Sequence, residues 1–376
     1  MADHTTTIAH DEELASQLRL TLVSGVGPRL RKALLARFQT ASNVFSAAPA
    51  DLREVPRVSA EIARRIAVAR EEIDVAAEMR LCADSGIALV SESDDAYPRT
   101  LREIHDPPGI LFMRGDLRPC DSLSIAIVGS RHATRYGIEQ AERLAGSLSR
   151  AGLTITSGLA RGIDAAAHRG ALAAGGRTLA VLGSGLLNIY PPEHEELASE
   201  VSAHGAVISE SPPQSKPLAG AFPQRNRIIT GLSLGVIVVE ASSQSGALIS
   251  ARHAMEQGRE VFAVPGRVDS RMSRGCHRLI RDGAKLVETA DDVLEELGPL
   301  VEKTSKSDGQ EIHHPAELLL NEIEQQVLSA VSTEPTTIDA VVATSGLPTG
   351  SVLATISALE MRRLIRRLSG NLVMRP

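Results

Sequence analysis

Short turns rich in glycine, serine and arginine follow a series of apolar runs in the middle of the chain. The runs are Ile125–Val128, Leu153–Thr156, Thr178–Leu182, Val207–Ser209 and Val236–Val239. A segment with a helical pattern follows each turn, and backbone N–H groups at a helix start suit an anionic ligand such as phosphate. Arginines in or near these turns add guanidinium groups that pair with phosphate oxygens. The predicted chemistry is therefore anion binding.

The apolar runs lack alternation and are separated by helices, which indicates a parallel sheet covered on both faces. We therefore expect an α/β fold of the doubly wound kind with a mainly parallel sheet. In such sheets the ligand lies at the carboxyl ends of the strands, where the turns gather. Ile110–Met113 is a further expected strand, at the edge of this sheet.

Composition favours a soluble, reduced, cytoplasmic protein. The chain has 376 residues, of which 43% are hydrophobic and 23% charged, and this length suggests two or three domains. No apolar run reaches about eighteen residues and the start lacks a signal-peptide pattern, so we expect no membrane span. The cysteines lie far apart and the histidines are scattered, so no metal or structural zinc is predicted. The net charge of −6 taken alone disfavours a nucleic-acid partner. However, the acidic residues cluster away from the arginine-rich turns, so these turns can still be locally positive.

Five segments are expected along the chain. Residues 1–10 are expected to be disordered, 11–86 to form an N-terminal helical domain, 87–297 the main α/β domain, 298–316 a polar linker and 317–376 a small C-terminal domain.

Two helices in the N-terminal domain, Asp11–Leu22 and Arg29–Phe38, flank the turn Val23-Ser-Gly-Val-Gly-Pro28. This pattern resembles a helix-hairpin-helix element, whose hairpin amides hold a nucleic-acid phosphate, and an ordinary turn between helices explains it equally well. A second candidate, Val55-Pro-Arg-Val-Ser59, lacks the glycines. We interpret it as the start of a long helix from Ser59 to Ala83, with Ser59 as its N-cap.

The C-terminal domain has the pattern of a winged helix. Three helices are expected over Asn321–Val331, Thr336–Thr344 and Pro348–Met361, the first with Ile323 and Val327 facing inward. Two strands, Leu364–Leu368 and Leu372–Met374, then form a hairpin. Arginines without acidic neighbours follow Met361, and they suit either a DNA-contacting wing or a protein-interaction surface.

Few residues in the main domain suggest catalysis. Ser157, Asp164 and His168 could imitate a nucleophile, acid and base, but an Asp164–His168 pair that supports a helix is the preferred interpretation. Glu240 could act as a base, and is better explained by hydrogen bonds to the amides of a neighbouring loop. The dinucleotide fingerprint, the P-loop and the GxSxG elbow are absent, which disfavours NAD, FAD and serine-hydrolase chemistry.

The segment Phe222-Pro-Gln-Arg-Asn-Arg-Ile-Ile-Thr-Gly231 is harder to explain by structure alone. Arg225, Asn226 and Arg227 lie at a helix start that should face the ligand edge, where they suit a phosphate chain or base edges. The alternative is that the arginines pair with Glu210 or Glu240. Aromatic residues are scarce and tryptophan is absent, so base stacking should be sparse and phosphate contacts should dominate.

From Tyr97 to Glu288 the chain resembles the DNA-processing protein A family, also called DprA or Smf. The shared motifs, in order, are Tyr97-Pro98, Asp106-Pro-Pro108, Ile127-Val-Gly-Ser-Arg131, Ser157-Gly-Leu-Ala-Arg-Gly-Ile-Asp-Ala-Ala-Ala-His168, Ala180-Val-Leu-Gly183, Ile189-Tyr-Pro-Pro192, Phe222-Pro223, Arg225-Asn-Arg-Ile-Ile229, Ser245-Gly-Ala-Leu-Ile249 and Val261-Phe-Ala-Val-Pro-Gly266.

The resemblance implies an extended Rossmann-like fold that binds single-stranded DNA without sequence preference. It also implies a non-enzymatic homodimer, without a cofactor, that protects incoming DNA during natural transformation and loads the RecA recombinase. The family's accessory domains match the N-terminal helices, which resemble SAM and helix-hairpin-helix domains, and the winged helix. By position, the implied DNA-binding residues are Gly129, Ser130, Arg131, Ser157, Gly158, Arg161, Gly162, Phe222, Arg225, Asn226 and Arg227.

An enzymatic alternative comes from the same variant of the Rossmann fold. The main domain also resembles nucleotide phosphoribohydrolases, which need a Pro-Gly-Gly-x-Gly-Thr turn with a downstream glutamate. Gln244-Ser-Gly246 follows the fifth strand instead, which disfavours that chemistry.

Overall fold

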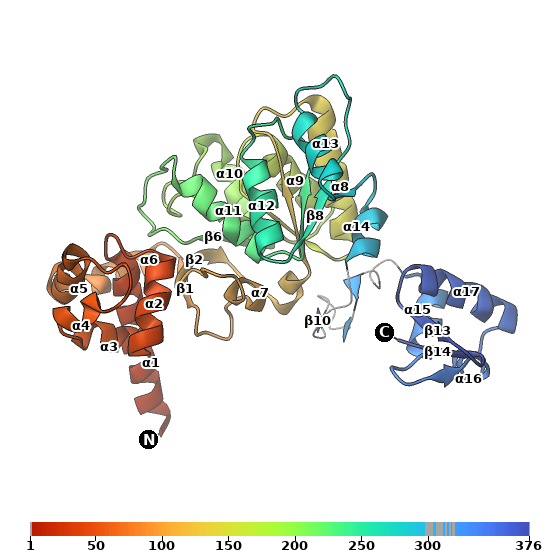
Figure 1. Cartoon of the computed structure of the whole chain (residues 1–376), viewed down its shortest axis with the longest axis horizontal. Coiled ribbons are helices and arrows are strands. Elements are labelled where there is room, and N and C mark those ends of the chain that lie inside the picture. The colour runs from red at the N-terminus through yellow and green to blue at the C-terminus, as the bar shows by residue number, and fades with distance from the viewer. Residues whose placement is uncertain are drawn as a thin grey trace.

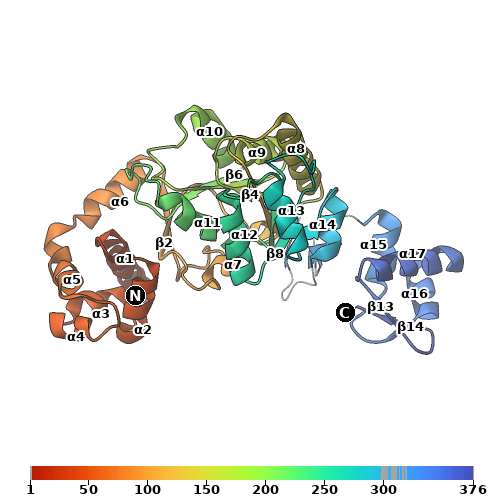
Figure 2. The ribbon, with the colours of Figure 1, turned by 45° about the horizontal axis from the view of Figure 1, so that its top comes forward.

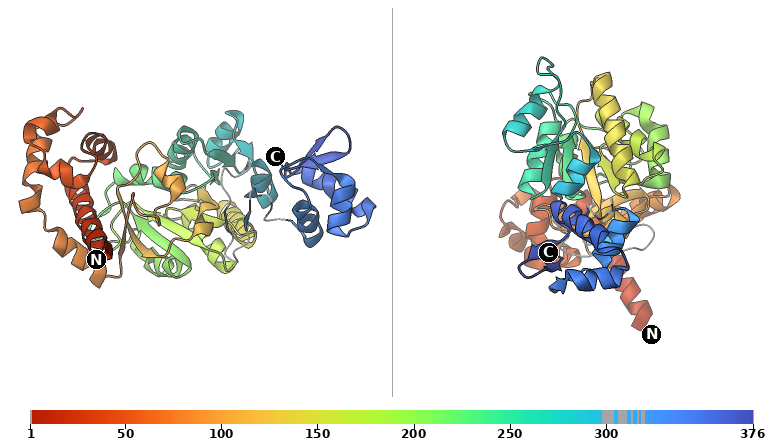
Figure 3. Two further views of the ribbon diagram at one scale, coloured as in Figure 1. Left: turned by 90° about the horizontal axis from the view of Figure 1, so that it is seen from below. Right: turned by 90° about the vertical axis from the view of Figure 1, so that its right-hand side faces the viewer.

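The computed structural model describes residues 2–297, 304–305, 311–312, 314–315, 317 and 320–375, with side chains from residue 12 onward except at 304–305 and 311–312. A central α/β unit lies between an N-terminal helical unit and a C-terminal unit, which are at opposite ends of the molecule (Figures 1 and 3). Most of the expected linker 298–316 lies outside the described residues, apart from the short strands β10 (Thr304–Ser305) and β11 (Glu311–Ile312).

The central unit is built on a nine-stranded sheet with the order β1-β2-β6-β5-β4-β3-β7-β8-β9. β1 and β2 run antiparallel to their neighbours, and the other pairs are parallel. The strands are β1 (Ala88–Ser91), β2 (Ile110–Gly115), β3 (Ser124–Val128), β4 (Thr154–Ser157), β5 (Thr178–Leu182), β6 (Gly205–Ser209), β7 (Gly235–Val238), β8 (Glu260–Ala263) and β9 (Lys285–Leu286). The mainly parallel sheet expected from the apolar runs is confirmed, while β1 and β9 were not predicted.

Helices cover both faces of this sheet. On one face α11 (Ala221–Gly231), α12 (Ala247–Glu256) and α13 (Arg274–Arg281) lie side by side, with α7 (Arg99–Arg102) beside α11 (Figure 2). Four other helices pack on the sheet in separate core clusters: α8 (Arg135–Arg150), α9 (Ile163–Ala173), α10 (Glu195–His204) and α14 (Ala290–Glu296). Two short 3-10 helices lie in the connecting loops, η1 (Pro119–Ser122) and η2 (Pro192–His194). Every residue of β3 is buried, as two covered faces require.

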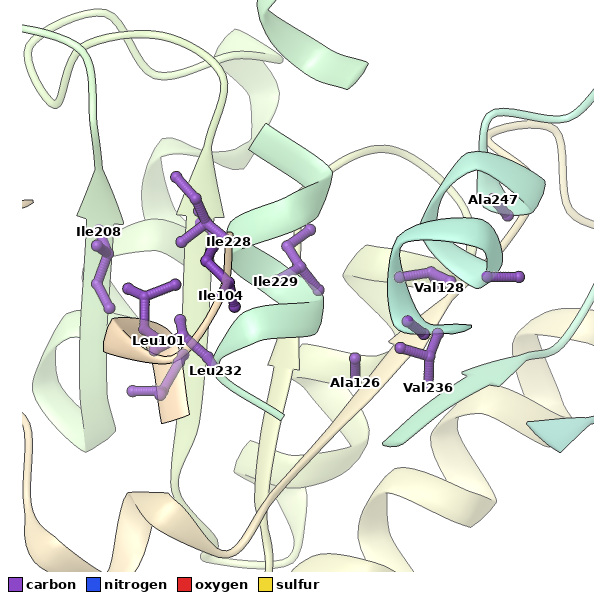
Figure 4. Close-up of a cluster of buried hydrophobic side chains, with 14 of the residues drawn as sticks. Leu101, Ile104, Ala126, Val128, Ile208, Ile228, Ile229, Leu232, Val236 and Ala247 are labelled. Atoms are coloured by element: carbon purple, nitrogen blue, oxygen red, sulfur yellow. The ribbon is translucent and has the colours of Figure 1, made fainter. Parts of the chain in front are cut away.

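Aliphatic side chains hold α11 and α12 against the sheet. Ile228, Ile229 and Leu232 of α11 pack with Leu101 and Ile104 of the α7 segment and with strand residues such as Ile208 (Figure 4). Ala247 of α12 lies over Val128 and Val236 in the same cluster. This packing fixes the first turns of both helices at the carboxyl ends of the central strands.

The N-terminal unit consists of α1 (Ala2–Leu22), α2 (Pro28–Phe38), α3 (Ala41–Ser46), α4 (Pro49–Arg53), α5 (Ala60–Glu72) and α6 (Val75–Asp84). The structure describes the backbone of α1 from Ala2, and the expected disorder of residues 1–10 stays a prediction. The expected long helix is wrong: it breaks at Ile73, and Asp74 caps α6 by accepting a hydrogen bond from the Ala77 amide.

The C-terminal unit is the expected winged helix, with α15 (Glu322–Ser329), α16 (Ile338–Ser345), α17 (Thr349–Met361), β13 (Arg366–Leu368) and β14 (Leu372–Met374). Thr336–Thr337, expected to be helical, instead forms β12 and pairs with β14. Ile323, expected inside, is 47% exposed. Within the described residues no single helix is long and apolar enough to cross a membrane, and α16 and α17 reach that length only as a pair bent by 112°.

Candidate functional site

A cavity of about 620 Å³ opens at the carboxyl ends of the central strands, and we call it the sheet-edge cavity. It contains five of the residues singled out from the sequence: Gly129, Arg131, Phe222, Arg225 and Asn226. Two further ones, Gly158 and Arg161, line a small recess that shares Arg131, Phe222 and Arg225 with the cavity. Residues from β3, the β4–α9 turn and α11 therefore meet, although they are far apart in the chain.

The N-termini of two helices, α11 and α12, face this cavity. α11 follows Gly220, and its Ala221 amide donates a hydrogen bond of 3.0 Å to the Leu218 carbonyl oxygen. α12 follows Gly246, and Ser245 accepts hydrogen bonds from the first two amides of this helix. The first turns of both helices lack acidic residues. Because the helix dipole favours negative charge and no acidic residue opposes it here, these helix starts suit an anion. The α12 start was missed as a site element, although Gly246 follows a strand in the same way as the other turns.

Arg225 is the buried cation of the cavity wall. Its side chain is 5% exposed, and Nη1 donates a hydrogen bond of 2.6 Å to the Val181 carbonyl oxygen. Its Nε has no hydrogen-bond partner in the described part of the chain. Burial lowers the pKa of Arg225 to about 10, against the opposing attraction of Asp164. The guanidinium is therefore charged at neutral pH and retains an unmet donor.

Arg225 depends on the absence of a side chain at Gly158. A Cβ at Gly158 would overlap the Arg225 guanidinium. Asp164 lies nearby in the first turn of α9, and burial raises the pKa of its carboxyl group, against the attraction of Arg225. Asp164 also lines the cavity, so one acidic group offsets part of the positive charge there.

Arg131 and two aromatic rings form the outer wall. The Arg131 guanidinium lies 5.0 Å from the centre of the Phe222 ring, and the Tyr190 ring lies 5.6 Å from Phe222 at an angle of 49°. Arg131 is exposed and has no ion pair within the described residues. Arg161 is also exposed, but Glu193 pairs with it and raises its pKa through that hydrogen bond. Arg131 is therefore the more available cation at the rim.

Four of the singled-out residues do not face this cavity. Ser157 is fully buried and donates a hydrogen bond of 2.6 Å to the Ile127 carbonyl oxygen. Ser130 accepts one from the His132 amide, and Gly162 has a positive φ of 74° against the Ser130 carbonyl. In this structure these three residues shape the turns. A direct contact to a ligand is not available to the buried Ser157 hydroxyl.

Arg227 is the fourth residue that does not face the cavity. It pairs with Glu210, which is the alternative stated in the sequence analysis. Its Nη2 donates hydrogen bonds of 2.8 and 3.0 Å to the two carboxylate oxygens of Glu210, and its Nε lies 3.5 Å from Asp106. The expectation that Arg227 stands beside Arg225 at the sheet edge is wrong, because residues two apart in a helix point in different directions. Arg227 lines a second cavity instead.

The other polar residues are explained by local structure. Glu240 accepts hydrogen bonds from the Thr134 amide and hydroxyl, at 2.8 and 2.6 Å, as the loop-bonding interpretation predicts. The expected Asp164–His168 pair is not formed: His168 bonds to Thr178 at 2.7 Å, and Asp164 to the Ala160 amide at 3.4 Å. Among the described residues, no hydrogen bond joins Ser157, Asp164 and His168 into a catalytic set.

Comparison with models of known protein families shows to which family the chain belongs. Residues 88–298, which include the whole sheet-edge cavity, match the family model described as DNA recombination-mediator protein A. The chain belongs to this family, DprA/Smf. A DprA winged-helix model matches residues 313–371, and a SAM-like helix-hairpin-helix tandem model matches residues 18–72.

Individual DprA/Smf proteins resemble the chain over most of its length. Protein Smf of Synechocystis is 35% identical over 96% of this chain and 98% of its own length. Protein Smf of Escherichia coli is 40% identical over 76% of each chain. The X-ray structure of DNA processing protein A from Streptococcus pneumoniae covers 76% of this chain and 98% of its own, with a TM-score of 0.67 and 37% identity. A Helicobacter pylori structure, described by its single-stranded DNA binding mode, covers 55% of this chain and 93% of its own, with a TM-score of 0.50 and 30% identity.

Proposed function

We propose that this DprA/Smf protein binds single-stranded DNA without sequence preference and performs no chemistry on it. The sheet-edge cavity supports this proposal most directly. Arg225, Arg131 and the starts of α11 and α12, whose first turns carry no acidic residue, converge there from separate parts of the chain. Donors of this kind recognise the phosphate backbone, which every sequence shares. The single-stranded DNA binding named for the H. pylori relative agrees with the proposal.

The aromatic wall supports a single strand over a duplex. Phe222 and Tyr190 are partly exposed beside Arg131, so an unpaired base has an aromatic surface on which to stack. The Tyr190 ring belongs to a loop and the Phe222 ring to the first turn of α11. Together they form one small platform, so phosphate contacts carry most of the affinity. Binding should therefore weaken steeply as salt rises.

The wider role that we propose follows the family resemblance. The protein protects incoming DNA during natural transformation and homologous recombination, acts in the cytoplasm as a homodimer, and loads RecA onto the strand. Two measurements test this role: light scattering for the dimer, and the rate of RecA filament assembly on single strands with and without the protein. A monomer, or an unchanged assembly rate, contradicts the corresponding part.

The DNA-binding proposal is tested by Arg131→Ala, with Arg135→Ala as the matched control. Both arginines are exposed, but Arg135 pairs with Glu139 and does not line the cavity. We expect the affinity of Arg131→Ala for an oligothymidylate to fall by roughly tenfold, because charge-assisted contacts contribute about 1.5–3 kcal/mol. The salt dependence of its binding should also lose about 0.7 in slope. Equal affinities of the two variants in fluorescence anisotropy would count against the site.

The enzymatic alternative has a direct test. Incubation with AMP, followed by chromatography for released adenine, measures phosphoribohydrolase activity. We expect no release above that of a buffer blank, and sustained turnover would replace the binding proposal with an enzymatic one.

A further inference from the structure

A second cavity, of about 610 Å³, lies between the N-terminal helical unit and the first turns of α11, and we call it the hairpin cavity. Gly25, Gly27, Arg29 and Arg57 line it from the helical unit, and Arg227 lines it from α11. Pro223 lines both cavities, so the two meet at the start of α11. Arg225 faces one side of this helix start and Arg227 the other.

We propose that the hairpin cavity is a second phosphate-binding site, which receives a single strand after it leaves the sheet-edge cavity over Pro223. This proposal rests on the single-stranded DNA binding proposed above, and adds a ligand contact in the N-terminal unit. It assigns a function to the helix-hairpin-helix pattern and to Arg227, neither of which the sheet-edge cavity uses.

The helical unit contains two hairpins of the same geometry. In the first, Gly25 has a φ of 92° and the Val26 amide bonds to the Val23 carbonyl at 3.0 Å. In the second, Arg57 has a φ of 72°, and the Val58 amide bonds to the Val55 carbonyl at 3.1 Å. The second hairpin was dismissed from the sequence because it lacks glycine, but Arg57 adopts the left-handed conformation in its place.

Only the first hairpin leaves its helix start open. α2 follows Gly27, has no side-chain cap and has no acidic residue in its first turn. α5 follows Ser59, whose hydroxyl accepts a hydrogen bond from the Ile62 amide at 3.2 Å, and its first turn carries Glu61. The amides at the start of α2 are therefore the ones available to a phosphate, while the second hairpin contributes the Arg57 side chain.

The side chains around this helix start add positive charge. Arg29, Arg57 and Arg227 line the cavity together with His253, and Asp106 and Glu210 are the acidic residues that line it. Both acids are engaged with Arg227, and Asp106 also lies 3.5 Å from Arg29. Arg57 is exposed, with no ion pair within the described residues. Arg227 is only 6% exposed, and its Nη1 has no hydrogen-bond partner in the described part of the chain.

Buried and polar contacts fix the helical unit against the sheet, so the two cavities keep their relative positions. Arg31 of α2 is 5% exposed and forms an ion pair with Glu92. Its side chain lies against Gly109, and a Cβ atom at Gly109 would collide with it. Lys32 donates a hydrogen bond of 2.9 Å to the His105 carbonyl oxygen. A strand can therefore bridge the two sites without first ordering a flexible domain.

The test combines the variant Arg29→Gln/Arg57→Gly with oligothymidylates of about six and about twenty nucleotides, short and long relative to a single binding site. Glycine at position 57 keeps the positive φ and removes only the guanidinium. The matched control is Arg80→Gln, an exposed arginine of the same unit outside the cavity. We expect the variant to bind the long oligonucleotide at least about fivefold more weakly, and its salt slope to fall by about 1.4. Its affinity for the short one should equal that of the wild type.

Asp106→Asn gives a second readout, because it removes a carboxylate that competes with phosphate for Arg29 and Arg227. We expect the affinity for the long oligonucleotide to rise and that for the short one to stay unchanged. Damage to the fold would lower affinity, so it cannot produce this result. If the wild type binds both oligonucleotides and neither variant changes the binding of the long one, the hairpin site is overturned and the sheet-edge site stands. If the wild type binds neither, both proposals fail together.

Discussion

At the scale of single residues, the candidate site depends on a buried cation that the fold holds without a full set of partners. Arg225 makes one hydrogen bond to Val181, and its Nε remains unpaired in the described part of the chain. A buried guanidinium in this state costs free energy, which a phosphate oxygen would recover on binding. Gly158 leaves the space that the guanidinium fills.

Gly158→Ala tests this arrangement. The added methyl group would overlap the Arg225 guanidinium, so the side chain must move away from the cavity wall. We expect a loss of about 1–3 kcal/mol in the free energy of unfolding, as is usual for overpacking, and a clear loss of affinity for single strands. Urea denaturation followed by circular dichroism measures the first quantity, and fluorescence anisotropy the second.

Gly220→Ala is the matched control for this prediction. Gly220 precedes α11 at the same rim, has a φ of −71°, and has open space where a Cβ would lie. Alanine at this position should leave both quantities within error of the wild type. If Gly158→Ala behaves like Gly220→Ala, the close contact with Arg225 does not matter for function.

At the scale of elements, the loop that carries Arg131 is held by a residue from a neighbouring strand. Glu240 follows β7 and is 3% exposed, and both of its carboxylate oxygens bond to Thr134 at the start of α8. The Thr134 hydroxyl also caps α8 by accepting a hydrogen bond from the Gly137 amide. One threonine therefore ties the β3–α8 loop to both the helix and the sheet.

Thr134→Val should loosen this loop, although the valine side chain has nearly the same volume as that of threonine. The substitution removes the helix cap and leaves one oxygen of a buried carboxylate without its donor, which together cost about 1–3 kcal/mol. Arg131 then loses its fixed position, so we expect weaker binding of single strands with the long-range fold intact. The measurements are thermal unfolding and anisotropy.

Thr134→Ser serves as the control, because serine retains the hydroxyl that makes both bonds. It should bind DNA like the wild type. Equal loss of affinity in the serine and valine variants would show that the hydroxyl bonds are not what positions Arg131.

The elements that build the site were predictable from the sequence because they depend on local patterns. Unbroken apolar runs ending in glycine-rich turns gave the five central parallel strands and the side on which Arg131 and Arg225 gather. Side-chain partners were not predictable in this way. The hydrogen bonds from Arg227 Nη2 to both carboxylate oxygens of Glu210, and the approach of Arg227 to Asp106, join segments whose spacing carries no signal, so only the folded chain reveals them.

Exceptions to residue preferences account for other differences. Arg57 has the positive φ that glycine usually adopts, so a search for glycines does not find the second hairpin. The break between α5 and α6 depends on Asp74, whose capping role competes with an otherwise continuous helical pattern. Each case is a position where tertiary structure overrides a local tendency.

At the scale of the whole molecule, stability should depend on pH through a histidine in the centre of the fold. His168 is fully buried and its Nδ1 lies 2.7 Å from the Thr178 hydroxyl. That hydroxyl donates its only hydrogen to the Ile155 carbonyl, which places the histidine proton on Nδ1 and leaves Nε2 as an unprotonated acceptor. Nε2 has no partner in the described part of the chain. Burial, and then the nearby charge of Arg225, lower the pKa of His168 to about 3.

This depressed pKa fixes the sign of the pH dependence. Well above its ordinary pKa of about 6.5 the histidine is neutral in both the folded and the unfolded chain, so its contribution to stability is complete. As the pH falls from there toward 3, the unfolded chain takes up a proton that the folded chain refuses, and stability is lost by up to about 1.4 kcal/mol per pH unit. His314, whose pKa burial lowers to about 4, acts in the same direction, so a difference between variants is needed to isolate His168.

His168→Asn provides that difference, because asparagine keeps a donor near Thr178 and does not titrate. Between about pH 7 and pH 5 the wild type should lose roughly 2 kcal/mol more of its free energy of unfolding than the variant does. The exposed His204, at the end of α10, supplies the control His204→Asn, which should retain the full pH dependence of the wild type. Urea denaturation at both pH values measures all three proteins. Identical pH dependences for the wild type and His168→Asn would mean that the buried imidazole accepts a proton in the folded chain, contrary to its complete burial.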